Sequence, residues 1–280
     1  MLAVVVEAGT VDGTAHEVVD ERRVAAPVDG DIVAAIEEFA GSFGRIASLG
    51  VGIAGLVRRS DDVVVTTTHL PNVRGLALRR DLEKRLGVPV AVDNDGTCAA
   101  VAEWRLGAAR GTDDAVVLTV GTGIGGAAIV NGRVSRGVHG YAGEFGHMVV
   151  VRDGEPCPCG RRGCWESYVS GRGLSRLADG EQPEAVLERF GRGDVEAKRA
   201  VDEFARWTAL GLFDLVSVFD PECIVLGGGL GSRPEILPLI RTHFRESVGG
   251  HAGRELPVVA NAALGALAGA IGAAFVGAGD

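Results

Sequence analysis

Short apolar runs alternate with helical hydrophobic repeats along the first hundred residues. The apolar run at 2–6 is closed by Gly9 and Thr10, which predicts a buried strand and a turn. Between 31 and 43, apolar side chains recur at i, i+3, i+4 and i+7, as in an amphipathic helix. Further strands are predicted at 48–53, 63–68 and 88–92, and further helices at 76–86 and 97–109. This alternation is typical of a layered α/β lobe.

The rest of the chain predicts a second group of strands and helices. Strands are expected at 115–120, 126–130, 223–226 and 257–261, with a hairpin signal at Asn131-Gly132 and a helical stretch at 181–219 that breaks near Gly191–Gly193. The polar, glycine-containing segment 107–114 is the best candidate for a hinge. We therefore expect one lobe from 1–108, joined by a C-terminal helix at 262–280, and a second lobe from 109–261.

Composition narrows the possible partners. The 280 residues include 28 basic and 37 acidic side chains, a formal charge of −9, which disfavours nucleic acid and anionic membranes. Residues 260–279 carry no charge, but they are mostly Ala and Gly, which suits close packing in a protein core better than a bilayer. The N-terminus lacks the positive region of a targeting signal, so we expect a cytoplasmic protein.

Four potential metal ligands lie within the eighteen residues 147–164: His147, Cys157, Cys159 and Cys164. Thiolates and an imidazole are ligands that tetrahedral zinc prefers, and four of them leave no position for water. A strained disulfide with a spare thiol, or simply small buried residues, are the alternatives. Five cysteines, an odd number, and no signal peptide favour a reducing compartment and a metal. We predict a structural zinc that pins this loop between Glu144 and Glu166.

Two glycine-rich segments follow predicted strands. Gly121-Thr122-Gly123-Ile124-Gly125-Gly126 could turn its backbone N–H groups toward an anion, although it lacks the Lys-Ser/Thr ending of a P-loop and could be only a turn. Gly227-Gly228-Gly229 is a weaker signal of the same kind, either a flat surface for a nucleotide or a sharp turn.

Carboxylates occupy positions suited to chemistry. Asp93-Asn94-Asp95 lies at the end of a predicted strand, where ligands bind in open α/β sheets, and a carboxylate there could act as a general base in phosphoryl transfer. The alternative is that Asp95 or Thr97 caps the following helix. Glu144 and Glu166 could be surface acids or, on either side of a rigid loop, acceptors for sugar hydroxyls.

Together these segments resemble the ROK family of sugar kinases and sugar-responsive regulators. The matching motifs are GVGIAG (50–55), VDNDGTCAA (92–100), VVLTVGTGIGG (116–126), GYAGEFGH (140–147), CPCGRRGCWES (157–167) and IVLGGGL (224–230). They span most of the chain in family order, and the His/Cys set followed by Glu166 is the most specific of them.

The resemblance implies a two-lobed, actin-like (ribonuclease H-like) α/β ATPase fold with the sugar in the cleft and ATP on the second lobe. It implies that Asp95 is the catalytic base and that sugar contacts come from Asn72, Asn94, Glu144, His147, Glu166 and Gly55. Zinc is assigned to His147 and the three cysteines. ATP contacts fall to Gly9, Thr10, Gly121, Thr122, Gly123, Gly125, Gly227, Gly228 and Gly229. A homodimer is also implied.

The first strand departs from the family pattern Asp-x-Gly-Gly-Thr. Val6 stands in place of the Asp, and Ala8 adds a Cβ where the backbone normally approaches phosphate; Ala54 also replaces an expected Pro. We expect an ATP- and Mg²⁺-dependent hexose kinase, with glucose or a related aldohexose favoured and an amino-hexose possible. The alternative is a sugar-binding protein with weak or lost kinase activity. A DNA-binding repressor is not expected, because the first strand begins at residue 2 and leaves no room for a helix-turn-helix.

Overall fold

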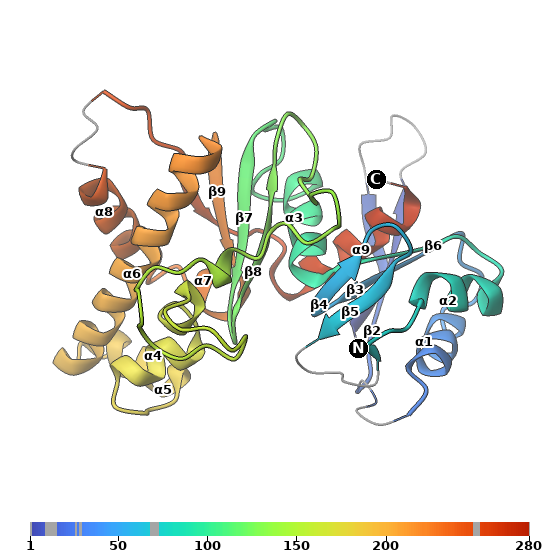
Figure 1. The fold of residues 1–280 in the computed structure, drawn as a ribbon, viewed down its shortest axis with the longest axis horizontal. Helices are drawn as coiled ribbons and strands as arrows, with labels where there is room; N and C mark the ends of the chain where they lie inside the picture. Colours follow the sequence, from blue (N-terminus) through green and yellow to red (C-terminus); the bar gives the residue numbers. More distant parts are fainter. Residues whose placement is uncertain are drawn as a thin grey trace.

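The computed structural model describes residues 2–8, 16–25, 27, 30–67, 73–248 and 253–279, and of residues 2–8, 16 and 17 it describes the backbone alone. Two lobes lie side by side (Figure 1). The N-terminal lobe contains strands β1 (Leu2–Ala8), β2 (His16–Arg23), β3 (Leu49–Ile53), β4 (Gly55–Arg58), β5 (Val63–Thr67) and β6 (Val90–Asn94), with helices α1 (Ile32–Gly41) and α2 (Leu78–Leu86). Its strands pair as β1 with β2, β3 with β6, and β4 with β5.

The C-terminal lobe is built on a four-stranded sheet in the order β10-β9-β7-β8. Its strands are β7 (Ala115–Val120), β8 (Ile124–Ile129), β9 (Cys223–Gly227) and β10 (Val258–Asn261). β7 runs parallel to β9 and antiparallel to β8. Its helices are α4 (Gly171–Leu177), α5 (Pro183–Gly191), α6 (Val195–Phe219), α7 (Gly228–Gly231) and α8 (Leu237–Ser247).

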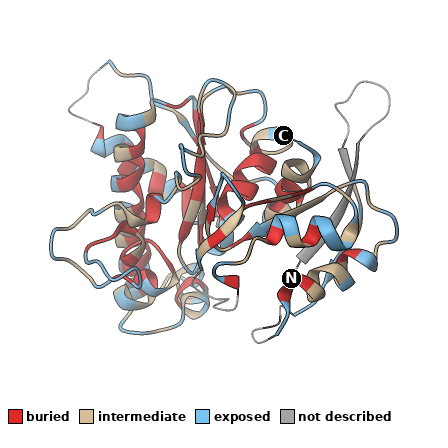
Figure 2. Ribbon diagram, turned by 45° about the vertical axis from the view of Figure 1, so that its right-hand side comes forward, coloured by how far each residue is buried: buried red, intermediate tan, exposed pale blue. Residues whose placement is uncertain are grey.

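The core of the C-terminal lobe lies between this sheet and α6, where Figure 2 shows buried residues on both. Trp165 is fully buried there, and its indole N–H donates to the Trp207 carbonyl oxygen at 2.9 Å. A Cβ on Gly211 of α6 would lie 2.1 Å from Cε2 of Trp165. Because α6 has glycine where the indole packs, the segment that carries Trp165 sits directly on the core.

Helices α3 (Asp95–Arg105) and α9 (Ala268–Ala278) pack against each other and against β3. A Cβ on Gly272 would lie 1.6 Å from the Cys98 carbonyl oxygen, and one on Gly50 would lie 1.6 Å from the Ala273 carbonyl oxygen. The Ala- and Gly-rich composition of α9 therefore permits close helix packing beside the blue N-terminal strands (Figure 1). Among the described residues, no helix has the length and apolar character needed to cross a bilayer.

One buried carboxylate, that of Glu103, accepts hydrogen bonds from two segments that are far apart in the sequence. Glu103 near the end of α3 is 1% exposed. Its Oε2 accepts hydrogen bonds from the N–H groups of Ala108 (2.9 Å) and Ala263 (3.0 Å), and its Oε1 accepts one from Leu264 (2.8 Å). Ala108 lies just after α3, and the other two lie between β10 and α9. These charge-assisted bonds satisfy a carboxylate that would otherwise be costly to bury.

The predicted elements are found, with shifted ends. The break near Gly191–Gly193 separates α5 from α6, and β8 begins at Ile124, two residues before the predicted start. The predicted helix 97–109 instead runs from Asp95 to Arg105. Strands β2 and β4 and helices α4, α7 and α8 were not predicted. Helices α4 and α7 are too short to show a repeat, whereas α8 does carry one, with Leu237, Ile240 and Phe244 on its buried face, and the sequence analysis missed it.

Candidate functional site

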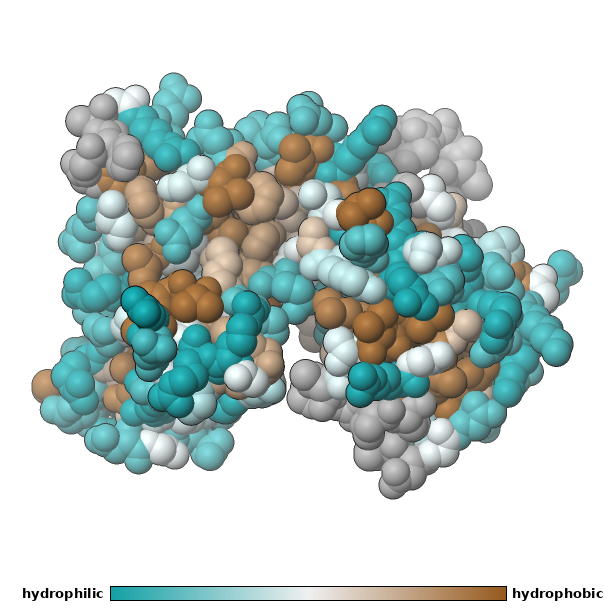
Figure 3. Space-filling view, in the orientation of Figure 1, coloured by the Kyte–Doolittle hydropathy of each residue, from teal (hydrophilic) through white to brown (hydrophobic). Residues whose placement is uncertain are grey.

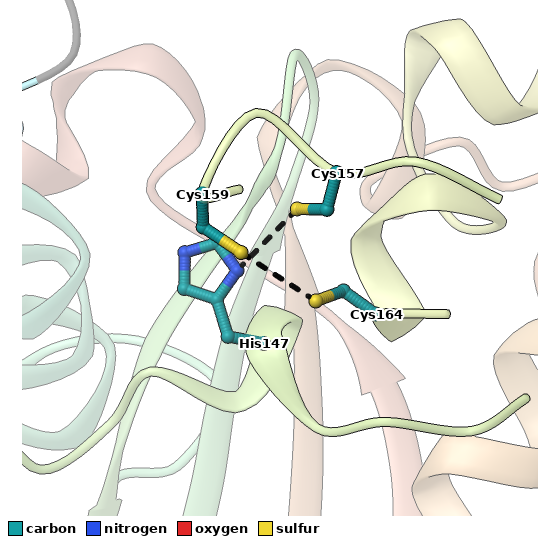
Figure 4. A group of neighbouring side chains, drawn as sticks. All are labelled: His147, Cys157, Cys159 and Cys164. Carbon is teal, nitrogen blue, oxygen red and sulfur yellow. Dashed lines mark hydrogen bonds between the residues drawn. The ribbon is translucent and has the colours of Figure 1, made fainter. Parts of the chain in front are cut away.

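His147, Cys157, Cys159 and Cys164 converge on one point (Figure 4), and their ligand atoms all lie within 4.8 Å of one another. Cys159 Sγ lies 3.7 Å from Cys164 Sγ, and Cys157 Sγ lies 3.8 Å from His147 Nδ1. A zinc tetrahedron with bonds of about 2.3 Å has sulfur–sulfur edges of about 3.8 Å. A disulfide would need a sulfur–sulfur distance of about 2.05 Å, so these free thiols fit zinc and do not form a bridge.

The backbone between the cysteines is folded tightly enough to chelate. Cys157 N–H donates to the Arg161 carbonyl at 2.8 Å, and Gly160 N–H donates to the Cys157 carbonyl at 3.0 Å. Gly163 has φ +77°, and a Cβ there would lie 1.6 Å from the Val151 carbonyl oxygen. A glycine is therefore required at the turn that precedes Cys164.

Without metal, the buried Cys164 thiol would hold its proton. Burial, together with hydrogen bonds to the neighbouring Cys159 and Cys157 thiols, raises the pKa of the Cys164 thiol to about 12. A bound zinc ion would have to displace that proton, because the thiolate is the ligand.

The segment 144–166, which holds the four potential zinc ligands and is called the zinc loop below, carries an acid at each end. Glu144 Oε2 lies 3.6 Å from His147 Nε2. The other ring nitrogen of His147, Nδ1, faces Cys157. Burial raises the pKa of Glu144; His147 opposes this shift, and the carboxylates of Glu166 and Asp95 add to it. The carboxylates of Glu166 and Asp95 therefore lie near enough to Glu144 to act on it.

Glu166 connects the zinc loop to the glycine turn between β7 and β8. Its side chain is 15% exposed, and its Oε2 accepts a hydrogen bond from the Ile124 N–H at 3.0 Å. A Cβ on Gly123 would lie 2.3 Å from the same oxygen. Arg172 Nη2 lies 3.6 Å from Oε1. The sequence did not single out the Ile124 N–H, because backbone donors leave no pattern in side-chain chemistry.

Asn94 and Asp95 stand where β6 meets α3. Asn94 is the helix N-cap: its Oδ1 accepts from the Thr97 N–H at 3.0 Å, and its Nδ2 donates to the Gly55 carbonyl at 3.1 Å. The alternative that Asp95 or Thr97 caps the helix is therefore wrong. Asp95 occupies the first helical position, and its Oδ1 accepts from the N–H of Gly96 at 3.0 Å.

The start of α3 lies against the glycine turn. A Cβ on Gly96 would lie 2.5 Å from the Gly126 backbone nitrogen. The segment that carries Asp95 thus contacts the second strand of the predicted phosphate-binding hairpin.

The two glycine segments lie side by side at neighbouring strand ends. Gly121, Thr122 and Gly123 form the turn after β7, and Gly125 follows the start of β8; Gly227 ends β9, and Gly228 and Gly229 begin α7. An added Cβ on Gly121 would lie 3.8 Å from the Gly229 nitrogen. Gly228 has φ +79° and approaches the Val120 carbonyl closely. Both segments therefore present backbone groups at the carboxyl ends of the neighbouring parallel strands β7 and β9.

Three predicted site residues, Gly9, Thr10 and Asn72, lie outside the described residues. On the face drawn in Figure 3, the surface is notched between the two lobes. The candidate residues come from the ends of β6, β7 and β9, from the start of β4 and from the segment 144–166.

Residues 4–278 match the model of the ROK family. The chain belongs to the ROK family. A glucokinase of Streptomyces coelicolor is 36% identical to it in an alignment 299 positions long, which covers 96% of this chain and 93% of the relative. An N-acetyl-D-glucosamine kinase of Pectobacterium carotovorum subsp. carotovorum is 32% identical over 259 residues, 85% of each chain.

A solved ROK structure has the same fold. The glucokinase of Streptomyces griseus, solved in complex with glucose and AMPPNP, superposes with a TM-score of 0.84 at 34% identity and full coverage of both chains. The predicted two-lobed, actin-like α/β fold is thereby confirmed for this ROK chain, as is the family to which its motifs were assigned.

Proposed function

We propose that this ROK protein is an ATP-dependent sugar kinase that transfers the γ-phosphoryl group to a hydroxyl of a hexose, with glucose or a related aldohexose favoured. The observation that carries the proposal is the hydrogen bond from the Ile124 N–H of the Gly121–Gly126 turn to Glu166, together with the close approach of Gly96, next to Asp95, to Gly126 of the same turn. The glucokinase and amino-hexose kinase relatives support it.

In the proposed reaction, Asp95 accepts the proton of the attacking hydroxyl as its oxygen bonds to the γ-phosphorus. The bond from that phosphorus to the bridging oxygen of ATP breaks, and ADP leaves with the electron pair. The backbone N–H groups of 121–126 would hold phosphate oxygens, and 227–229 would face the adenosine. The nucleotide enters as MgATP, whose metal neutralises phosphate charge. Catalysis therefore depends on positioning and electrostatics.

Sugar hydroxyls would be held by Asn94, Glu144, His147 and Glu166, with Gly55 and Asn72 lining the same side. Glu144 and Glu166 provide acceptors that suit hydroxyl donors. Zinc on His147 and the three cysteines would be structural and would take no part in a chemical step; it would fix the loop between the two glutamates.

A screen of hexoses and N-acetylated amino-hexoses tests the activity. With MgATP, glucose should yield sugar phosphate and ADP in equal amounts. Polyphosphate should be included, because the phosphoryl donor is not fixed by these residues. The kinase proposal fails if no sugar is phosphorylated with either donor.

The zinc proposal has a separate test. Elemental analysis of protein purified without added zinc should find about one zinc per chain, as expected for one closed site. Cys159→Ala should lose the metal, whereas Cys223→Ala, which removes a buried thiol outside the cluster, should retain it. Full zinc content in the Cys159 variant would rule the site out.

A sugar-binding protein with weak kinase activity is the second candidate, because Val6 and Ala8 alter the first phosphate motif. Calorimetric titration separates the two. Binding of glucose without measurable binding of MgATP would favour this second function.

We also propose that residues 1–108 and 262–280 form one lobe and residues 109–261 the other. The packing of α9 on β3 supports this division.

The free thiols support a reducing, cytoplasmic location. A homodimer is proposed from the family to which the chain belongs. Light scattering after gel filtration would give the dimer mass or exclude it.

A further inference from the structure

A largely buried ion pair joins the end of β6 to the loop after β8. Arg136 Nε lies 2.7 Å from Asp93 Oδ2, and the two side chains are 21% and 12% exposed. An ion pair on the surface contributes little to the free energy of unfolding. Removal of one partner from a buried pair, in contrast, leaves the other charge buried without compensation. The two residues come from different lobes and are 43 positions apart in the sequence.

The other oxygen of Asp93 acts on the catalytic segment. Asp93 Oδ1 accepts a hydrogen bond from the Asn94 N–H at 2.9 Å. Asn94 in turn caps α3 and donates to the Gly55 carbonyl. The guanidinium of Arg136 therefore acts, through one carboxylate, on the backbone that places Asp95.

The loop that begins at Arg136 leads directly to Glu144. The Arg136 carbonyl accepts from the Ala142 N–H at 3.2 Å and closes the loop on itself, while the His139 carbonyl accepts from the Arg59 N–H at 3.0 Å. A Cβ on Gly140 would lie 2.6 Å from the Val57 carbonyl oxygen, so the loop rests tightly on β4. One end of the loop is fixed at Asp93 and the other runs into the zinc loop.

The charges around this pair are consistent with a positioning role. Burial raises the pKa of the Cys98 thiol, Asp93 and Asp95 add to this shift, and Arg136 opposes it, so all three charged groups lie near the start of α3. The positive charge of Arg136 thus offsets the negative charge of Asp93, which lies beside Asp95.

We propose that Arg136 is a positioning residue that, through its ion pair with Asp93, sets Asp95 relative to Glu144 without touching the substrate. The inference rests on the proposed kinase function. Phosphoryl transfer demands such spacing, because a displacement of about 1 Å can cost about a hundredfold in rate.

The experiment compares Arg136→Met, Arg136→Lys, Asp93→Asn and the Met/Asn double variant. The readouts are kcat, KM for glucose, KM for ATP, the glucose dissociation constant and the melting temperature. Arg85→Met is the control, because Arg85 forms an exposed pair with Asp31 and Glu37 between α1 and α2.

Arg136→Met and Asp93→Asn should each lower kcat/KM for glucose about tenfold to a hundredfold at a temperature where both are folded. KM for ATP should stay unchanged, the double variant should lose no more than either single variant, and Arg136→Lys should recover part of the loss. Arg85→Met should retain wild-type kinetics.

A lowered melting temperature with kcat and glucose KM within about twofold of wild type would reduce the pair to a purely structural role. If the wild-type protein lacks turnover, the kinase proposal fails separately. The glucose dissociation constants would then decide the role of the ion pair. Arg136→Met and Asp93→Asn should weaken glucose binding, and unchanged dissociation constants would contradict the positioning role.

Discussion

Glu166 accepts a hydrogen bond from the backbone N–H of Ile124, at 3.0 Å. This bond ties the last residues of the zinc loop to the glycine turn that follows β7. A proposed sugar acceptor and a proposed phosphate cradle are thus held in fixed relation. The site depends on this junction, because phosphoryl transfer needs the hydroxyl and the γ-phosphate aligned.

Gly123→Ala tests the junction. The added Cβ would lie 2.3 Å from Glu166 Oε2 and would push the carboxylate away. We expect kcat/KM for glucose to fall about tenfold to a hundredfold, since both reactants are misplaced. Gly191→Ala, where nothing lies within 4 Å of the new Cβ, should behave as wild type. Unchanged kinetics in the Gly123 variant would show that Glu166 does not need this position.

Asp95→Asn tests the proposed base. An amide cannot accept the hydroxyl proton, so kcat should fall about 10²- to 10⁴-fold while KM for glucose changes little. Asp153→Asn is the matched control, because that side chain is 87% exposed. Steady-state kinetics of the two variants decide the assignment. Retention of a tenth or more of wild-type kcat by the Asp95 variant would exclude it as the base.

Val6→Asp combined with Ala8→Gly tests the altered first motif. The pair restores the acid and removes the Cβ at the positions where the ROK pattern has Asp and Gly. We expect kcat/KM for MgATP to rise about tenfold or more, because the restored carboxylate would face the magnesium ion of MgATP and the glycine would let the backbone approach the phosphates. Kinetics with varied MgATP measure this. An unchanged value would mean that the first strand does not limit the reaction.

Two adjacent aspartates should respond oppositely to pH. Hydrogen bonds from Arg58 lower the pKa of Asp61, whereas burial raises the pKa of Asp62 despite its ion pair with Arg79. Charged Asp61 therefore stabilises the fold, and that stability is lost as pH falls through its lowered pKa. Charged Asp62 destabilises the fold, and that penalty disappears as pH falls below the ordinary carboxyl pKa.

Asp61→Asn should accordingly lower the melting temperature at pH 7, and Asp62→Asn should raise it. The positive φ of 51° at Asp62 is one that Asn tolerates. Both differences should shrink toward pH 3. Shifts of the same sign at pH 7 would contradict the account of these two groups.

The metal ligands and the main strands were predictable because their signals are local. Four soft ligands in a short glycine-rich segment indicate zinc without knowledge of the fold, and the apolar runs of β7 and β9 indicate buried strands. The closely packed α9 followed from its Ala and Gly content. Each of these features depends on residues close together in the sequence.

The remaining features depend on contacts between distant residues. Glu103 looks like an ordinary helical acid until the segments 107–109 and 262–264 are brought onto it. Arg136 and Asp93 are paired only by the approach of β6 and the loop after β8. Strand β2, with the polar sequence HEVVDERR, has no clear alternation and takes its pairing from β1.

In this account, a bound zinc ion holds Glu144, His147 and Glu166 in positions from which they can hydrogen-bond to a sugar that faces Asp95. Calorimetric titration of glucose into zinc-loaded, zinc-stripped and zinc-restored protein tests this most directly, with circular dichroism to establish that the stripped lobes stay folded. We predict that glucose binds the loaded protein, that binding is lost on removal of zinc, and that it returns when zinc is restored. Equal glucose affinity with and without zinc would contradict the account.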